Sequence, residues 1–170
     1  LASHGEILDG HLDEGAGAFD ALQLADAIDM LGASLSTSSS YDASSVSLHA
    51  LVSTLDAALP IAISSRFGNA GQTCIAAKRF IVVDTIADAF VERFVAAAQK
   101  LQVGDPMLDA STLAPMARTD LRAEVHAQVQ RSIAAGATLL CGGEMLPQAT
   151  GYPATILDQV GLGQPAYHEE

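Results

Sequence analysis

Apolar residues recur every three or four positions in three stretches of the chain, as they do on the buried face of a helix. The first stretch, residues 20–32, ends at Gly32 and predicts an amphipathic helix. The same spacing predicts helices over residues 86–101 and 120–135, the second of them closed by Gly136. The apolar faces of these two helices are formed by Ala87, Phe90, Phe94 and Leu101 and by Leu121, Val125, Val129 and Ile133.

Alternation of small polar and apolar residues marks strands instead. Residues 33–40 and 45–52 alternate in this way, which predicts a hairpin with its turn at 41–44. Residues 53–59 favour another helix, which we expect Pro60 to disturb. Two apolar runs predict a buried strand at 81–83 and a short strand at 137–140, the latter followed by a turn at Gly142-Gly143.

The order of these elements predicts the fold class. From residue 61 onward strands alternate with helices, which is typical of an α/β fold with a mostly parallel sheet and covering helices. Residues 1–60 predict an α+β segment instead, a helix followed by a hairpin. The chain therefore divides into residues 1–60 and residues 61–170.

Charge supports this division. Residues 1–60 contain nine acidic residues and no Lys or Arg, whereas all 8 Lys and Arg lie in residues 61–170. The difference suggests that the two parts have separate origins. The net charge of −12 also argues against nucleic acid as a partner, because phosphate binding needs clustered cations.

The composition excludes other classes of protein. An apolar fraction of 49% over 170 residues is typical of a folded domain. No apolar run approaches the roughly 20 residues of a membrane helix, so we expect no membrane partner and a cytoplasmic protein. The two cysteines, Cys74 and Cys141, are too few for a disulfide scaffold and fit a reducing compartment.

Residues 1–60 match the pattern of a known family but lack the residues that would bind its metal ion. The runs at 12–15, 21–36 and 44–51 resemble the insulinase/pitrilysin family of zinc peptidases, specifically its repeats that lack the metal site. Zinc would need two histidines one helical turn apart, but only His11 and Glu14 have suitable spacing and Gly15 stands where the second histidine belongs. We therefore expect no metal site, and the alternative function for this segment is non-catalytic assembly.

Cys74 is the candidate for chemistry. It follows a glycine-containing stretch, residues 67–73, and precedes the strand predicted at 81–83. A cysteine attacks as its thiolate, and a loop that presents it beside backbone N–H groups can favour that form and stabilise an oxyanion. Taken alone, a single cysteine beside Ile75 is more often an inert small hydrophobe. The surrounding motif reverses that interpretation.

Asn69-Ala70-Gly71-Gln72-Thr73-Cys74 resembles the cysteine signature of the aldehyde dehydrogenase superfamily, and the following run to Phe80 resembles its succinate-semialdehyde dehydrogenase branch. The resemblance continues through a loop at 113–116 and a strand at 152–157. It implies that Cys74 is the nucleophile and that Asn69, Gly71 and Gln72 belong to its supporting loop. Cys141 has no comparable setting and is interpreted as a buried thiol at the end of a strand.

The resemblance also implies a reaction and its cofactor. In this superfamily a thiolate attacks an aldehyde, hydride passes to NAD or NADP, and the thioester is hydrolysed. Residues 166–170 resemble the start of the motif whose second glutamate contacts the nicotinamide ribose, so Glu170 inherits that role. Full-length members are homo-oligomers. The sequence leaves open which aldehyde is the substrate and whether NAD or NADP is used.

Two parts of that machinery are missing from their expected positions. The general base should lie some thirty-odd residues before Cys74, but Asp42 is the only acid in the window 34–47. Nearly all of the nucleotide-binding domain should also precede the cysteine. We therefore expect a chimeric fragment, partly aldehyde dehydrogenase and inactive alone, with a purposeful two-domain fusion as the alternative.

Overall fold

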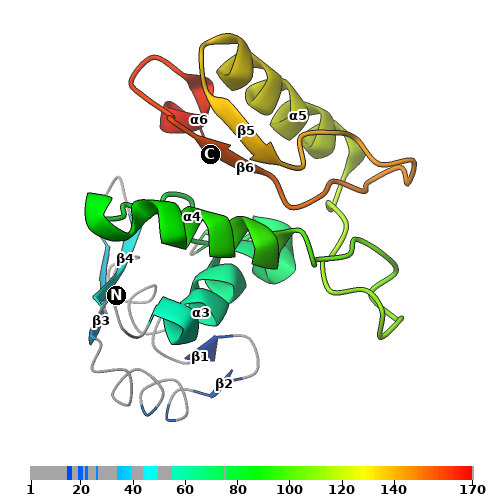
Figure 1. Ribbon diagram of the computed structural model, residues 1–170. Helices are drawn as coiled ribbons and strands as arrows, with labels where there is room; N and C mark the ends of the chain where they lie inside the picture. Colours follow the sequence, from blue (N-terminus) through cyan, green and yellow to red (C-terminus); the bar gives the residue numbers. More distant parts are fainter. Residues whose placement is uncertain are drawn as a thin grey trace, which may run out of the picture. The chain divides into compact units, whose positions relative to one another are not determined.

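The computed structural model describes residues 15–16, 19–20, 22, 26, 34–39, 44–49, 55–74 and 76–169 (Figure 1). The chain forms two compact units, Leu1–Phe90 and Val91–Glu170. The division falls within a single helix, α4 (Asp84–Ala98). None of the helices in the described ranges is both long and apolar enough to cross a membrane.

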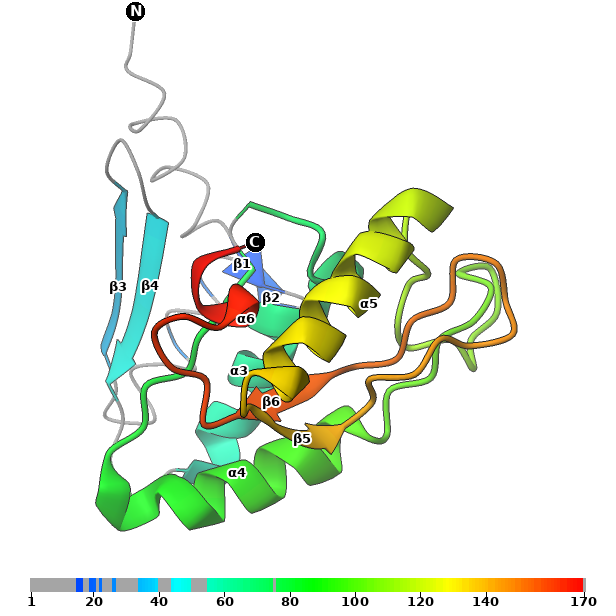
Figure 2. The ribbon, with the colours of Figure 1, turned by 90° about the horizontal axis from the view of Figure 1, so that it is seen from above.

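The first unit contains two small antiparallel sheets. β1 (Gly15–Ala16) pairs with β2 (Phe19–Asp20), and β3 (Ser34–Ser39) pairs with β4 (Ser44–His49). Figure 2 shows β3 and β4 side by side as one hairpin. The predicted hairpin is therefore confirmed, although its turn lies outside the described residues. Of the helix predicted over 20–32, Leu22 and Asp26 are helical and the remaining residues, apart from the β2 residue Asp20, lie outside the described ones.

Helix α3 (Leu55–Phe67) corrects the expectation that Pro60 would disturb a helix here. Proline inside a helix removes one hydrogen bond and costs about 3 kcal/mol. That cost is offset because the helix buries a continuous apolar stripe, while Pro60 itself is exposed. The stripe is spaced three and four residues apart and consists of Leu55, Ala58, Leu59 and Ala62.

The buried strand predicted at 81–83 is wrong. Residues 77–83 have no regular secondary structure, and the side chains of Ile81 and Val83 are 100% and 67% exposed. A strand needs a neighbour to pair its backbone, and no described strand forms a ladder with this segment. Phe80 packs instead through its ring, whose centroid lies 5.9 Å from that of Phe90, the last residue of α4 within the first unit.

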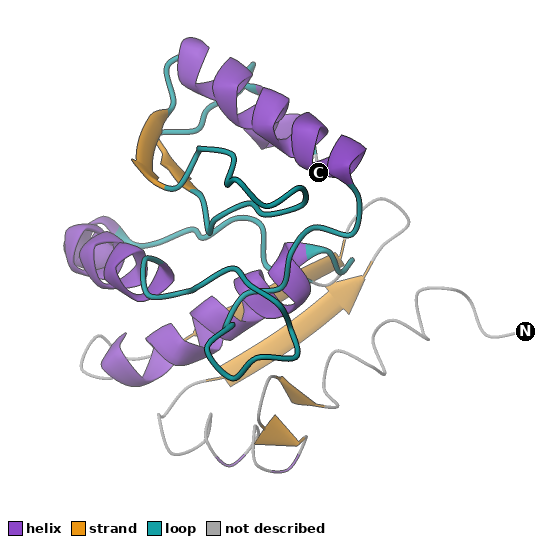
Figure 3. Ribbon diagram, turned by 90° about the vertical axis from the view of Figure 1, so that its right-hand side faces the viewer, coloured by secondary structure: helices purple, strands orange, loops and turns teal. Residues whose placement is uncertain are grey.

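The two long helices predicted from periodicity are confirmed, α4 across the boundary between the units and α5 within the second unit. α4 begins at Asp84 and ends at Ala98, and α5 (Thr119–Ala134) follows after a long loop (Figure 3). β5 (Thr138–Cys141) and β6 (Ile156–Asp158) form a hairpin, and α6 (Pro165–His168) completes the unit. The most buried apolar residues of the unit are Phe94, Ala98, Leu113, Val129, Ala137, Tyr152 and Ala154.

The expectation of a mostly parallel sheet also needs correction. The three ladders within the described ranges are antiparallel, and parallel pairing there is limited to an isolated bridge between Val103 and Leu113. β5 and β6 are joined by a loop rather than by a crossover helix, and a connection without a crossover leaves neighbouring strands antiparallel. Gly142 and Gly143, where a turn was predicted, have positive φ of 72° and 81° and no regular secondary structure.

Two buried polar side chains join α5 to α6. Ser132 is 0% exposed, and its Oγ accepts a hydrogen bond of 2.9 Å from the Ala166 N–H in the first turn of α6. In return, Gln164 Nε2 donates to the Ala135 carbonyl at the end of α5, at 3.1 Å. A side chain of α5 therefore accepts from a backbone N–H at the start of α6, and the side chain of Gln164, which precedes α6, donates to a backbone carbonyl at the end of α5.

We predict that Ser132→Ala lowers the free energy of unfolding by about 1–3 kcal/mol, because it leaves the Ala166 N–H without its acceptor. Urea denaturation followed by circular dichroism measures this change. Glu124→Ala, at an exposed position of the same helix, is the matched control. Equal effects of the two substitutions would contradict the role given to Ser132.

Candidate active site around Cys74

The loop that leads to Cys74 is built on three consecutive residues in the left-handed region of backbone space. Asn69, Ala70 and Gly71 have φ of 49°, 57° and 74°, within the short 3-10 segment Gly68–Gly71 that follows α3. Asparagine and glycine tolerate this conformation, but alanine does not favour it, and a left-handed residue with a Cβ costs about 1–2 kcal/mol. Such a turn persists only where its surroundings hold it.

Hydrogen bonds hold the turn from both ends. The Asn69 carbonyl accepts two of them from Gln72, one from the backbone N–H and one from Nε2, each 3.1 Å long. Further along, the Ala77 N–H donates to the Ser65 carbonyl in the last turn of α3, at 3.0 Å. The segment between Ser65 and Ala77 is thus a closed loop rooted on the end of the helix.

Cys74 lies near the tip of this loop and is exposed. A hydrogen bond of 3.0 Å from the Ala76 N–H to the Thr73 carbonyl closes a tight turn that contains it. No acceptor among the described residues takes the Cys74 N–H. The thiol can therefore be reached by an electrophile, and its own N–H can serve the oxygen of a carbonyl that the sulfur attacks.

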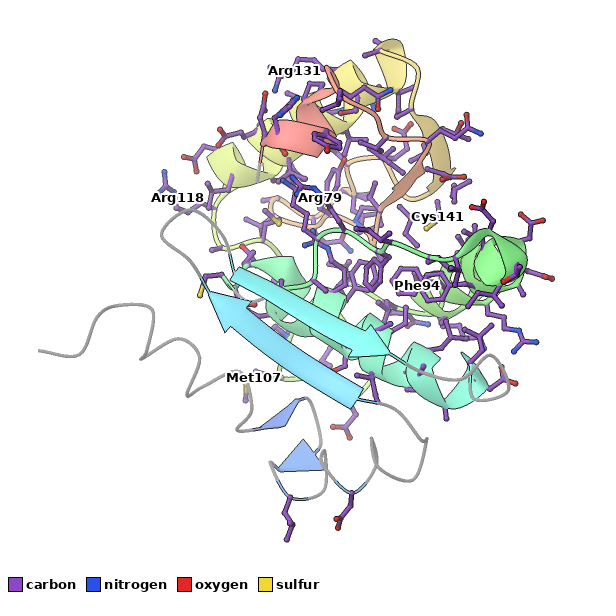
Figure 4. The ribbon with its side chains drawn as sticks, turned by 90° about the vertical axis from the view of Figure 1, so that its left-hand side faces the viewer. Arg79, Phe94, Met107, Arg118, Arg131 and Cys141 are labelled. Atoms are coloured by element: carbon purple, nitrogen blue, oxygen red, sulfur yellow. The ribbon has the colours of Figure 1, made fainter. Side chains whose placement is uncertain are left out.

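Cys141 has the opposite environment. It is half-buried at the end of β5 (Figure 4), with Sγ 3.7 Å from the Ala154 carbonyl oxygen. Burial raises the pKa of the Cys141 thiol, and a backbone hydrogen bond with Ile156 opposes that shift. The interpretation of Cys141 as a strand-end thiol without an activating group agrees with this geometry.

The contact between Gly71 and Arg66 was not predicted from the sequence. A Cβ placed on Gly71 would lie 3.0 Å from Arg66 Cζ and 3.1 Å from both Nη2 and the Arg66 carbonyl oxygen. The guanidinium therefore packs against the glycine backbone. No pattern in the sequence signals this contact, because it exists only when the turn between the two residues is left-handed.

Other residues singled out in the sequence fall into two groups. His11, Glu14 and Glu170 lie outside the described residues, as does Asp42, the only acid in the window where the general base is expected. Lys78 is half-buried and Arg79 is exposed, both in the segment without regular secondary structure that precedes α4. Over the described ranges, no three His, Cys, Asp or Glu side chains are grouped to hold a metal ion.

The structure describes the approach to Glu170 up to the preceding residue. Glu169 Oε2 accepts a hydrogen bond from Arg131 Nη2 on α5, at 2.7 Å, in an exposed ion pair. With the link between Ser132 and α6, this pair fastens residues 165–169 to the last turns of α5.

A model of the aldehyde dehydrogenase family matches residues 46–170, which include the whole Cys74 loop. The chain belongs to this family. The match begins inside the segment 1–60, whose resemblance to zinc peptidases stays a prediction, as does the division of the chain at residue 60.

Succinate-semialdehyde dehydrogenases are among the chain's most similar relatives in this family. The succinate semialdehyde dehydrogenase (NAD(P)+) Sad of Escherichia coli (strain K12) is 50% identical over 117 residues, which is 68% of this chain and 25% of that protein. A probable NADP+ enzyme of the same kind from Synechocystis is 46% identical over 117 residues, 68% of this chain and 26% of that protein. The chain thus spans about a quarter of the length of these curated relatives.

Solved aldehyde dehydrogenase structures share the fold. Succinate-semialdehyde dehydrogenase from Burkholderia pseudomallei matches with a TM-score of 0.63 and 34% identity, over 68% of this chain and 24% of that one. Aldehyde dehydrogenase 21 from Physcomitrella patens, solved with the reaction product succinate, gives 0.64 and 30% over 68% and 24%. The α/β class of the family is therefore established for this chain.

We predict that Gly71→Ala destabilises the protein by at least about 1–2 kcal/mol, because alanine would occupy a positive φ and press on the Arg66 backbone. Gly68→Ala is the matched control: a Cβ there meets nothing within 4 Å. We expect the control to change the free energy of unfolding by no more than about 0.5 kcal/mol. Chemical denaturation of the two variants tests the difference, and a smaller loss for Gly71→Ala than for Gly68→Ala would refute it.

We also predict a pH dependence for Cys141 in a Cys74→Ser variant. The thiolate is the form that alkylates, and the raised pKa leaves less of it at a given pH. Alkylation by iodoacetamide, followed by mass spectrometry, should therefore reach half its maximal rate at a higher pH than for a free cysteine peptide. A midpoint at or below that of the peptide would contradict the effect of burial.

Proposed function

We propose that this chain is the nucleophile-bearing part of an NAD(P)-dependent aldehyde dehydrogenase that acts on a semialdehyde of the succinate class. The observation that carries the proposal is the exposed Cys74 on a strained, closed loop inside the family match. The choice of substrate rests on the 50% and 46% identity to succinate-semialdehyde dehydrogenases.

The first chemical step follows from the loop. The Cys74 sulfur adds to the aldehyde carbon, the C–S bond forms, and the electron pair of the carbonyl π bond moves to the oxygen. The Cys74 N–H donates to that oxygen as negative charge develops on it, and the proton lost by the thiol finally returns to it. The product is a thiohemiacetal, and no oxidant is consumed.

Oxidation beyond the thiohemiacetal needs groups that the described residues do not supply. NAD or NADP supplies the hydride acceptor, and the residue assigned to it, Glu170, lies outside the described residues. Asp42, the one acid in the window where the general base is expected, also lies outside them. The chemistry proposed for residues 1–170 is therefore the addition step alone.

This proposal predicts a covalent adduct at Cys74. When the chain is mixed with succinate semialdehyde carrying ¹³C at the aldehyde carbon, a thiohemiacetal resonance should appear in the ¹³C spectrum. Cys74→Ser should abolish that resonance, while Cys141→Ser, the matched control, should leave it unchanged. An adduct that survives Cys74→Ser, or one lost equally in both variants, would overturn the proposal.

A further inference from the structure

Arg66 and Ser65, adjacent residues at the end of α3, hold the two ends of the Cys74 loop. The entering end is held at Gly71, against which the Arg66 guanidinium packs. The leaving end is held at Ala77, whose N–H donates to the Ser65 carbonyl at 3.0 Å. Both anchors thus lie on one turn of one helix.

Cys74 lies midway between these anchors. It is the third residue after Gly71 and the third before Ala77. Because a chain reaches at most about 3.6 Å per residue, its Cα lies within roughly 11 Å of each anchor. Movement of either anchor therefore changes where the thiol is presented.

Within the described part of the chain, the Arg66 side chain packs against Gly71 and forms no ion pair. Burial lowers the pKa of its guanidinium, which means that the charged group has lost part of its hydration. Among the described residues no acidic side chain pairs with it. Partial desolvation of a cation is unfavourable by itself, and the contacts of the planar group and stem with Gly71 offset part of this cost.

The same contact explains why residue 71 is glycine. A positive φ alone can be met by asparagine, as at Asn69, but any Cβ at position 71 would lie within 3.1 Å of Arg66 atoms on two sides. Glycine therefore permits both the left-handed turn and the close approach of the guanidinium.

We propose that Arg66 is a positioning residue for Cys74: by packing against Gly71 it holds the left-handed turn on the end of α3 and so fixes the thiol and its N–H for attack on a carbonyl. The contact itself is independent of function, whereas the consequence for carbonyl addition rests on the proposed function. Addition depends on this geometry because sulfur and N–H must engage the same carbonyl group.

The test compares three variants of the full chain with the parent. Arg66→Ala should lower the equilibrium constant for the ¹³C thiohemiacetal at Cys74 by about tenfold, a factor that corresponds to losing one well-placed hydrogen bond. Arg66→Lys, which keeps the stem and charge but not the planar group, should restore part of it. Lys100→Ala, the charge-matched control at an exposed position in the second unit, should leave it unchanged.

Amide hydrogen exchange supplies a second readout. The Gln72 and Ala77 N–H groups, which close the loop, should exchange about tenfold faster in Arg66→Ala, while the Ala166 N–H keeps the parent rate. If Arg66→Ala does not fold, Arg66→Lys carries the test, with an adduct constant and exchange rates between those of the parent and complete loss.

The outcomes separate this inference from the proposed function. A parent chain that forms no adduct at Cys74 overturns both. A parent that forms the adduct, with Arg66→Ala forming it equally well or with Lys100→Ala weakening it as much, overturns the role of Arg66 alone. Loss in Arg66→Ala with recovery in Arg66→Lys supports it.

Discussion

The left-handed turn at Asn69, Ala70 and Gly71 is the constraint on which the site depends. Two of its three residues carry a Cβ, so the turn is costly compared with extended or helical backbone. Gln72 contributes two hydrogen bonds to one carbonyl of the turn, and the bond between Ala77 and Ser65 closes the loop behind it. Without these contacts the segment would relax, and nothing would define the direction in which Cys74 points.

The support for this turn comes from the helix before it. The last carbonyl groups of a helix have no partner within the helix, and here the one at Ser65 is used to receive the returning chain. The helix can serve as a base because its apolar stripe, from Leu55 to Ala62, is buried, and this burial outweighs the proline that interrupts its hydrogen bonding. The stripe thus stabilises, indirectly, the loop that follows it.

The sequence predicted those features that depend on local spacing. The helices at Asp84–Ala98 and Thr119–Ala134 were predictable because a period near 3.6 is complete within each segment. The strand expected at 81–83 was not, because an apolar run shows only that residues suit a sheet, whereas a ladder needs a partner elsewhere. Pro60 was misjudged for a related reason: its local cost is visible in sequence, but the burial that offsets it is not.

The two cysteines show where sequence suffices for a site and where it does not. The tight glycine-containing loop that the motif around Cys74 indicated is present, with positive φ at Asn69 and Gly71 and with Cys74 exposed. The motif did not indicate that Ala70 would also have positive φ, nor that Arg66 would pack on Gly71. Both features depend on how the chain returns to α3. Cys141 shows the converse: burial raises its pKa beside the Ala154 carbonyl, an environment set by a hairpin register that spacing alone does not define. Reactivity therefore follows from the backbone around a thiol, and only part of that backbone is encoded next to it in the sequence.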